Sequence, residues 1–200
     1  MSAATTIVDY GAGNLRSVQN TLEELGARYE VTNRPEVVQA ARKIILPGVG
    51  HFGQMMRAMD DLGLREPIIA RIQAGVPFLG ICIGLQCLFE SSEESPGSKG
   101  LGIFPGTIKR FVGEARIPHM GWNSLSRTKP SRLLEGLDDG PFTYFAHSYY
   151  APLLPATAAS CTYIHPYTAI LEEESVFGVQ FHPEKSGSVG LRVIKNFLEL

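Results

Sequence analysis

Residues 76–90, VPFLGICIGLQCLFE, place a cysteine between two glycines where a predicted strand meets a predicted helix. The apolar run 76–79 predicts a buried strand, and residues 85–90 predict the helix. A reactive residue in this setting is typical of a nucleophile elbow, which presents its side chain at the carboxyl end of the strand. The helix N-terminus would favour the thiolate of Cys82. A buried cysteine in a glycine-rich turn fits the stretch equally well, so both interpretations remain open here.

The chain before this stretch alternates short apolar runs with amphipathic ones. Strands are predicted at 5–10, 29–32 and 43–46, and helices at 15–25, 35–41, 53–62 and 65–74. Strands that alternate with helices favour a parallel sheet covered on both faces.

The pattern changes after Glu90. A polar loop is predicted at 91–102, and a final helix begins with Ser188 as its cap. Between them, short strands are predicted at 107–112, 120–125, 142–149, 160–164, 167–172 and 176–181. We therefore expect one domain, residues 1–200, with a flavodoxin-like three-layer α/β/α fold, a mostly parallel central sheet and an antiparallel β extension.

Charge and cysteine content exclude several classes of protein. The net charge is −2 with mixed signs, so no nucleic-acid surface is expected. Three cysteines in 200 residues do not make a disulfide framework, and no apolar run approaches membrane-spanning length. Because residues 1–6 lead straight into a strand, we also expect no signal peptide and a cytoplasmic protein. Cys82 and Cys87 lack zinc-type spacing, so no metal is expected.

A second candidate site for chemistry follows the last predicted strand. His182 and Glu184 are separated by one proline, so one turn supplies a base and a carboxylate to orient it. A cysteine hydrolase needs such a base, and the carboxyl ends of strands in a doubly wound sheet lie near each other. An isolated His-Pro-Glu would be read as an exposed turn. Together with the glycine-flanked Cys82, it favours a Cys-His-Glu triad.

FLGICIGLQ, PGVG and QFHPEKS together resemble the triad-type, class I glutamine amidotransferases. Within that class, VDYGAGNLRSV, LPGVGHFGQMM, PHMGWN and AHSYY resemble the glutaminase subunits of imidazole glycerol phosphate synthase, over residues 7–197. The resemblance implies that Cys82 attacks the side-chain amide of glutamine. It also implies that His182 transfers protons and that Glu184 orients His182.

The resemblance assigns further residues to the site and its surroundings. It implies an oxyanion hole made by backbone groups of Val49, Gly50 and Ile83. It implies glutamine binding by Gln86, Glu94, Ser148 and Tyr149, and partner contacts by Asn14, Trp122 and Lys185. His51, His119 and His165 are expected to be structural or surface residues, and His147 is left open.

The implied partner is a (β/α)₈-barrel synthase subunit in a heterodimer, which receives ammonia from this chain. No cofactor is implied, and the GAGN sequence 11–14 lacks the third glycine of a dinucleotide-binding loop. Three alternatives remain. The chain could serve another synthase, such as pyridoxal phosphate or anthranilate synthase, or be a cysteine hydrolase on the same fold. It could also be a flavodoxin-like binding module with an incidental cysteine.

Overall fold

The structure, a computed structural model, describes residues 5–12 and 14–200. Residues 1–4 and Gly13, which belong to the predicted N-terminal segment and to the GAGN sequence, lie outside the described residues. No helix in the described part of the chain is long and apolar enough to span a bilayer.

The first half of the chain forms the parallel part of a large sheet. Its strands are β1 (Thr5–Val8), β2 (Tyr29–Thr32), β3 (Ile44–Gly48) and β4 (Phe78–Cys82), joined by β13 (Val176–Val179) from near the C-terminus. These five strands pair in parallel in the order β2-β1-β3-β4-β13. All residues of β1, β3, β4 and β13 are buried, which explains why these strands carry no charged residue and are mostly apolar.

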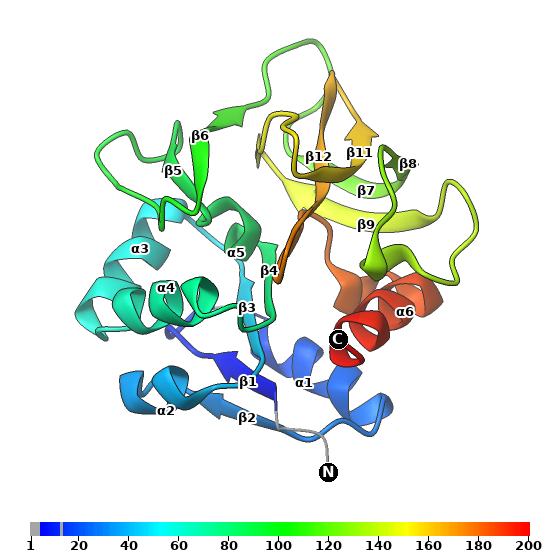
Figure 1. Ribbon diagram of the computed structural model, residues 1–200. Helices are drawn as coiled ribbons and strands as arrows, with labels where there is room; N and C mark the ends of the chain where they lie inside the picture. The colour runs from blue at the N-terminus through cyan, green and yellow to red at the C-terminus, as the bar shows by residue number, and fades with distance from the viewer. Residues whose placement is uncertain (1–4, 13) are drawn as a thin grey trace.

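Helices cover both faces of the sheet. They are α1 (Leu15–Glu24), α2 (Pro35–Ala40), α3 (Phe52–Asp61), α4 (Arg65–Gln73) and α6 (Gly187–Leu198). Figure 1 shows α3 and α4 on one side of the strands and α1 and α6 on the other. Each helix buries one stripe; α1, for example, buries Val18, Thr21 and Leu22. The predicted three-layer arrangement is confirmed.

The second half of the chain extends the sheet with antiparallel strands. β12 (Pro166–Glu173), β11 (Thr157–Thr162) and β8 (Ser126–Arg127) continue it beyond β13. Two small sheets accompany it. One pairs β7 (His119–Ser124) with β9 (Phe142–His147), and the other joins β5 (Phe89–Ser92), β6 (Phe104–Arg110) and β10 (Tyr149–Tyr150). The antiparallel extension is therefore also confirmed.

The predicted helix at 85–90 is wrong in its second half. The helix, α5 (Ile83–Gln86), is a single turn, and residues 89–92 form β5 instead. The carbonyl oxygens of Cys87 and Leu88 accept hydrogen bonds from the backbone of residues 101–104, so they are not available to continue a helix. Gly100 permits this approach, because a Cβ there would lie 1.9 Å from the carbonyl oxygen of Phe89. Tertiary pairing thus overrides the local helical pattern.

Several strand bounds differ by a few residues from the sequence-based expectation, for example β6 and β11, and two further differences concern the last helix and the strand predicted at 142–149. Helix α6 begins at Gly187, so Ser188 lies inside it and Ser186 precedes it. The Ser186 hydroxyl donates to the His182 carbonyl at 2.7 Å and accepts from the Tyr144 amide at 3.0 Å, so it joins the helix start to β9. The strand predicted at 142–149 is divided into β9 and β10 around Ser148.

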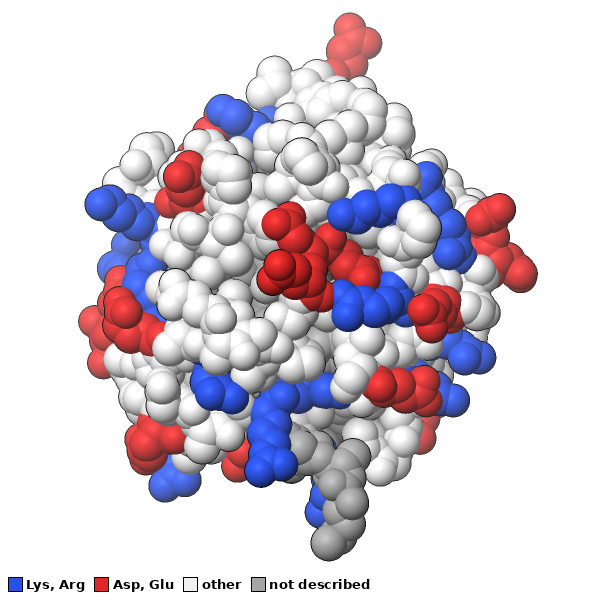
Figure 2. Space-filling view, viewed as in Figure 1, with Lys and Arg blue, Asp and Glu red and all other residues white. Residues whose placement is uncertain are grey.

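The surface in Figure 2 carries acidic and basic side chains interspersed on the visible face.

Candidate active site

Cys82 lies at the end of β4 in a strained turn. Its φ is 54° and its ψ is −107°, a conformation that costs a non-glycine residue about 1–3 kcal/mol. The glycines on either side are required by close packing. A Cβ at Gly80 would lie 2.3 Å from the Gly84 carbonyl oxygen, and a Cβ at Gly84 would lie 2.0 Å from the Leu46 carbonyl oxygen. The elbow therefore packs closely against β3. The structure has the predicted strand–turn–helix geometry.

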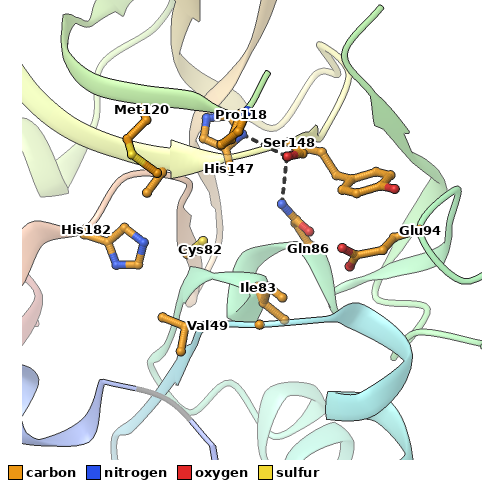
Figure 3. Close-up of a pocket in the computed structure, with 13 residues that line it drawn as sticks. Val49, Cys82, Ile83, Gln86, Glu94, Pro118, Met120, His147, Ser148 and His182 are labelled. Carbon is orange, nitrogen blue, oxygen red and sulfur yellow. Dashed lines mark hydrogen bonds between the residues drawn. The ribbon is translucent and has the colours of Figure 1, made fainter. Parts of the chain in front are cut away.

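Sheet register brings the histidine to the cysteine. β13 pairs in parallel with β4, and Val179 lies opposite Ile81. The chain leaving β13 therefore runs beside Cys82, and His182 lies three residues after Val179. Figure 3 shows the imidazole of His182 beside the sulfur of Cys82. Two residues 100 positions apart meet because neighbouring parallel strands end at the same edge of the sheet.

Glu184 holds the other side of the imidazole. Its Oε1 lies 2.8 Å from His182 Nδ1, and both side chains are almost completely buried. Burial opposes a charged imidazole, but hydrogen bonds to Cys82 and Glu184 outweigh burial and raise the pKa of His182 to about 10. The second carboxylate oxygen of Glu184 is buried with no hydrogen-bond partner among the described residues. The pair can therefore hold a proton near the Cys82 sulfur.

A cavity of about 230 Å³ opens in front of Cys82. Nine residues that the sequence motifs and the family resemblance assign to catalysis, the oxyanion hole or glutamine binding lie around this one cavity (Figure 3): Val49, Gly50, Cys82, Ile83, Gln86, Glu94, Ser148, Tyr149 and His182. Glu184 lies behind His182 and does not line it, nor do Asn14, Trp122 and Lys185. The structure thus brings the predicted site residues together and leaves the predicted interface residues outside.

Hydrogen bonds between distant segments of the chain stabilise the walls of the cavity. The Gln86 amide donates to the Tyr149 carbonyl at 2.8 Å, and the Glu94 carboxylate accepts from the Phe52 amide at 2.7 Å. Glu94 therefore acts as an N-terminal cap for α3 from another part of the chain. The Val49 carbonyl accepts from the Tyr10 hydroxyl at 3.5 Å, which links the 47–50 loop to the end of β1.

Sequence reasoning missed several residues that line or support the cavity. Pro118 and Met120, from the PHMGWN motif, line it, as does His147, to which the sequence assigns no role. Burial lowers the pKa of His147 to about 3, so its imidazole is neutral at pH 7. His119 is buried and its Nδ1 lies 3.1 Å from the Tyr167 hydroxyl, in keeping with the structural role expected of it. The PHMGWN motif was the available signal for Pro118 and Met120.

Comparisons with known proteins agree with this geometry. Residues 6–200 match the family described as glutamine amidotransferase class-I. This chain belongs to the class I glutamine amidotransferase family. Proteins named imidazole glycerol phosphate synthase subunit HisH are similar to this amidotransferase. The one from Methanothermobacter thermautotrophicus is 47% identical over 195 residues, covering 97% of both chains, and that from Methanocaldococcus jannaschii is 46% identical over 196 residues, covering 97% of this chain and 98% of the relative.

Solved structures share the fold of this amidotransferase at lower identity. The crystal structure of a glutamine amidotransferase aligns with a TM-score of 0.76 at 20% identity, covering 97% of each chain. The structure of PurLQS from Thermotoga maritima also aligns with a TM-score of 0.76 at 20% identity, covering 100% of this chain and 99% of that one. The predicted family and fold class are confirmed, and the chain is an enzyme of the glutamine-hydrolysing class.

Proposed function

We propose that this amidotransferase is the glutaminase subunit of an imidazole glycerol phosphate synthase, acting as a single domain over residues 1–200. The observation that carries the proposal is the 47% identity, over 97% of both chains, to a protein with that subunit's name. The strained cysteine with a histidine and a glutamate beside one cavity supports glutamine hydrolysis as the reaction. Its three cysteines are unpaired, which favours the cytoplasm.

In the first chemical step, the Cys82 sulfur attacks the side-chain amide carbon of glutamine. A C–S bond forms and the amide oxygen takes up the negative charge. Backbone N–H groups of Ile83 and of the Val49–Gly50 loop, which line the cavity, would stabilise that oxyanion. Each such donor stabilises a transition state by about 2.7–4 kcal/mol in other acyl-transfer enzymes. A change in the orientation of the Val49–Gly50 loop could therefore switch the rate of glutamine hydrolysis.

His182 then transfers protons in both halves of the reaction. Its imidazolium protonates the departing nitrogen, the C–N bond breaks, and ammonia leaves behind a γ-glutamyl thioester. The neutral imidazole next removes a proton from water, whose oxygen attacks the thioester carbon and releases glutamate and the Cys82 sulfur. Glu184 stabilises the charged imidazole through the 2.8 Å contact at Nδ1. Because the carboxylate is buried, little water screens this interaction.

Glutamine would lie between His182 and Glu94, which border the cavity from opposite sides in Figure 3. Glu94 and Gln86 present oxygen atoms suited to the α-ammonium group of an amino acid. Ser148 and Tyr149 line the same wall, and their main-chain groups would supply further polar contacts to the substrate. The side-chain amide of the substrate would then reach Cys82.

A partner surface is expected beside the cavity. The register of β7 and β9 puts Met120, Trp122 and Phe142 on one face, and they are 65%, 56% and 58% exposed. Lys185 extends over the Tyr144 ring on the same strand pair, with its Nζ 5.9 Å from the ring centroid. An exposed apolar face of this kind is typical of a protein–protein contact.

Met120 both lines the cavity and belongs to this face, so ammonia formed at Cys82 would be released close to it. We therefore propose a (β/α)₈-barrel synthase partner in a heterodimer, contacted by Trp122, Lys185 and Asn14. Asn14 precedes α1, and its side-chain oxygen accepts a hydrogen bond from Ser17 at 2.8 Å.

The test is glutamate release from glutamine by the purified chain, alone, with the barrel synthase subunit, and with that subunit and its nucleotide ligand. Cys82→Ala is the control. We expect hydrolysis mainly in the complete mixture and none with Cys82→Ala. A hydrolysis rate that does not change when the barrel subunit is added would assign the chain to another synthase, such as pyridoxal phosphate or anthranilate synthase. A folded chain inactive in every mixture would contradict the proposal.

A further inference from the structure

Gln180 lies on the route between β13 and His182 and is completely buried. Its Nε2 donates a hydrogen bond to the Cys82 sulfur at 3.6 Å, and its Oε1 accepts one from Gln86 Nε2 at 3.1 Å. One side-chain amide therefore bridges the nucleophile and a residue of the expected glutamine-binding wall. Neither the proposed proton transfers nor the oxyanion hole uses this residue.

The direction of this bridge is determined by a backbone carbonyl. The Tyr149 oxygen can only accept, so the group of Gln86 that faces it at 2.8 Å must be the NH₂. The same NH₂ donates to Gln180, so Gln180 must present its oxygen to Gln86 and its own NH₂ to Cys82. Both N–H bonds of Gln86 are thereby used, so its remaining polar atom, the side-chain oxygen, can only accept, and Gln86 lines the cavity.

The Tyr149 carbonyl is itself held from the opposite side. His147 Nδ1 lies 2.9 Å from the Tyr149 oxygen, and His147 Nε2 lies 3.2 Å from the Tyr167 hydroxyl. Because the carbonyl only accepts, Nδ1 carries the proton and Nε2 accepts from the tyrosine. A continuous set of buried and partly buried hydrogen bonds thus extends from Tyr167 to Cys82 and determines which groups donate and which accept.

We propose that Gln180 is a positioning residue with two separable roles, the second of which rests on the proposed function. Its NH₂ stabilises the thiolate of Cys82, because a donor to sulfur favours the charged form. Its oxygen holds Gln86 in the orientation that turns the Gln86 oxygen toward the α-ammonium group of glutamine. The first role concerns reactivity of the nucleophile, and the second concerns affinity for the substrate.

Two substitutions separate the roles. Gln180→Met keeps the length of the side chain but removes both the donor and the acceptor. Gln180→Glu keeps an oxygen for Gln86 and replaces the donor beside Cys82 with a second oxygen. We therefore expect both variants to weaken the thiolate, and only Gln180→Met to weaken recognition of the substrate.

The first measurement is the rate of Cys82 alkylation by iodoacetamide between pH 5 and pH 10, a reaction in which the thiolate displaces iodide. Iodoacetamide needs no glutamine site, and Cys82→Ala identifies the labelled sulfur. We expect both Gln180 variants to shift the midpoint of this profile upward by about one pH unit, the size of one charge-assisted hydrogen bond. Among the described residues, His182, Tyr10 and Tyr167 interact electrostatically with this sulfur, and the variants leave them unchanged.

The second measurement uses a glutamine analogue that alkylates thiols, and reports the concentration that gives half-maximal inactivation. We expect this concentration to rise about tenfold in Gln180→Met and to stay within about twofold of wild type in Gln180→Glu, by the loss or retention of one polar contact. Asn196→Leu is the matched control. It removes another buried amide, which donates to the Leu133 and Glu135 carbonyls in a different part of the fold.

Asn196→Leu should lower the unfolding midpoint and leave both alkylation measurements unchanged. Gln180 variants that lose only stability, with wild-type alkylation profiles, would overturn the inference and make Gln180 a structural residue. The iodoacetamide measurement stands even if wild-type protein hydrolyses no glutamine, so failure of the proposed function is distinguishable from failure of this inference.

Discussion

Replacing Glu184 by glutamine tests how the triad holds a charged histidine. Glu184 Oε1 lies 2.8 Å from His182 Nδ1, and both side chains are buried, so the pair has little access to water. Glutamine keeps an oxygen that can accept from Nδ1 but carries no charge. The substitution therefore removes the electrostatic part of the interaction and preserves its geometry.

The expected magnitude follows from the burial of this pair. Removing one partner of a buried ion pair costs about 3–5 kcal/mol, and the retained hydrogen bond favours the lower value. A loss of about 3 kcal/mol in the stability of the imidazolium corresponds to a roughly hundredfold decrease in kcat. The KM for glutamine should change little, because Glu184 does not line the cavity. The free energy of unfolding should fall by less than the loss of about 3 kcal/mol that lowers kcat. The reason is that one Glu184 oxygen already lacks a partner among the described residues.

The assay is the pH dependence of glutamine hydrolysis by wild type and Glu184→Gln, measured with the synthase partner present. Loss of the neighbouring negative charge lowers the pKa of His182 from about 10, so the alkaline limit of activity should move to lower pH. Glu184→Asp keeps the charge, so its kcat and its alkaline limit of activity should lie between those of wild type and Glu184→Gln. A Glu184→Gln enzyme with wild-type kcat and an unchanged alkaline limit would refute the role given to this carboxylate.

Three further predictions concern the elbow, the cavity wall and the buried histidine. Gly80→Ala puts a Cβ 2.3 Å from a backbone oxygen of the elbow and should abolish Cys82 alkylation by iodoacetamide or prevent folding, whereas Gly97→Ala, with no atom near its Cβ, should resemble wild type in the same labelling assay. Glu94→Ala removes the acceptor for the Phe52 amide and should lower the free energy of unfolding by about 1 kcal/mol in urea titrations and raise KM. The folded-state pKa of His147, about 3, lies below its ordinary value of 6.5, so the unfolded chain binds more protons. The free energy of unfolding therefore decreases as pH falls below 6.5. Urea titrations from pH 4 to pH 7 should therefore show that His147→Gln is less sensitive to acid, by at most about 1.4 kcal/mol per pH unit; identical slopes would contradict the reasoning.

Local sequence was sufficient for most of the fold. Buried parallel strands are apolar along their whole length, and helices such as α1 show a single apolar stripe, so their residues indicate both type and approximate bounds. The same holds for the elbow, where two glycines are demanded by backbone contacts within 2.3 Å. Prediction was wrong at 85–90, where a short helix is followed by β5 because residues 101–104 occupy the local carbonyl groups.

The sequence by itself determined which residue types could carry the chemistry: a cysteine in a strained turn, and a histidine with a carboxylate two residues away. It also indicated that they would meet, because strands of one parallel sheet end at a common edge. Only the tertiary structure decided how their surroundings are oriented. The direction of the Gln180 amide depends on the Tyr149 carbonyl, which contacts Gln86 across 63 positions of sequence. A hydrogen bond between distant segments leaves no periodic pattern in the chain, so its donor and acceptor are known only once the fold has brought them together.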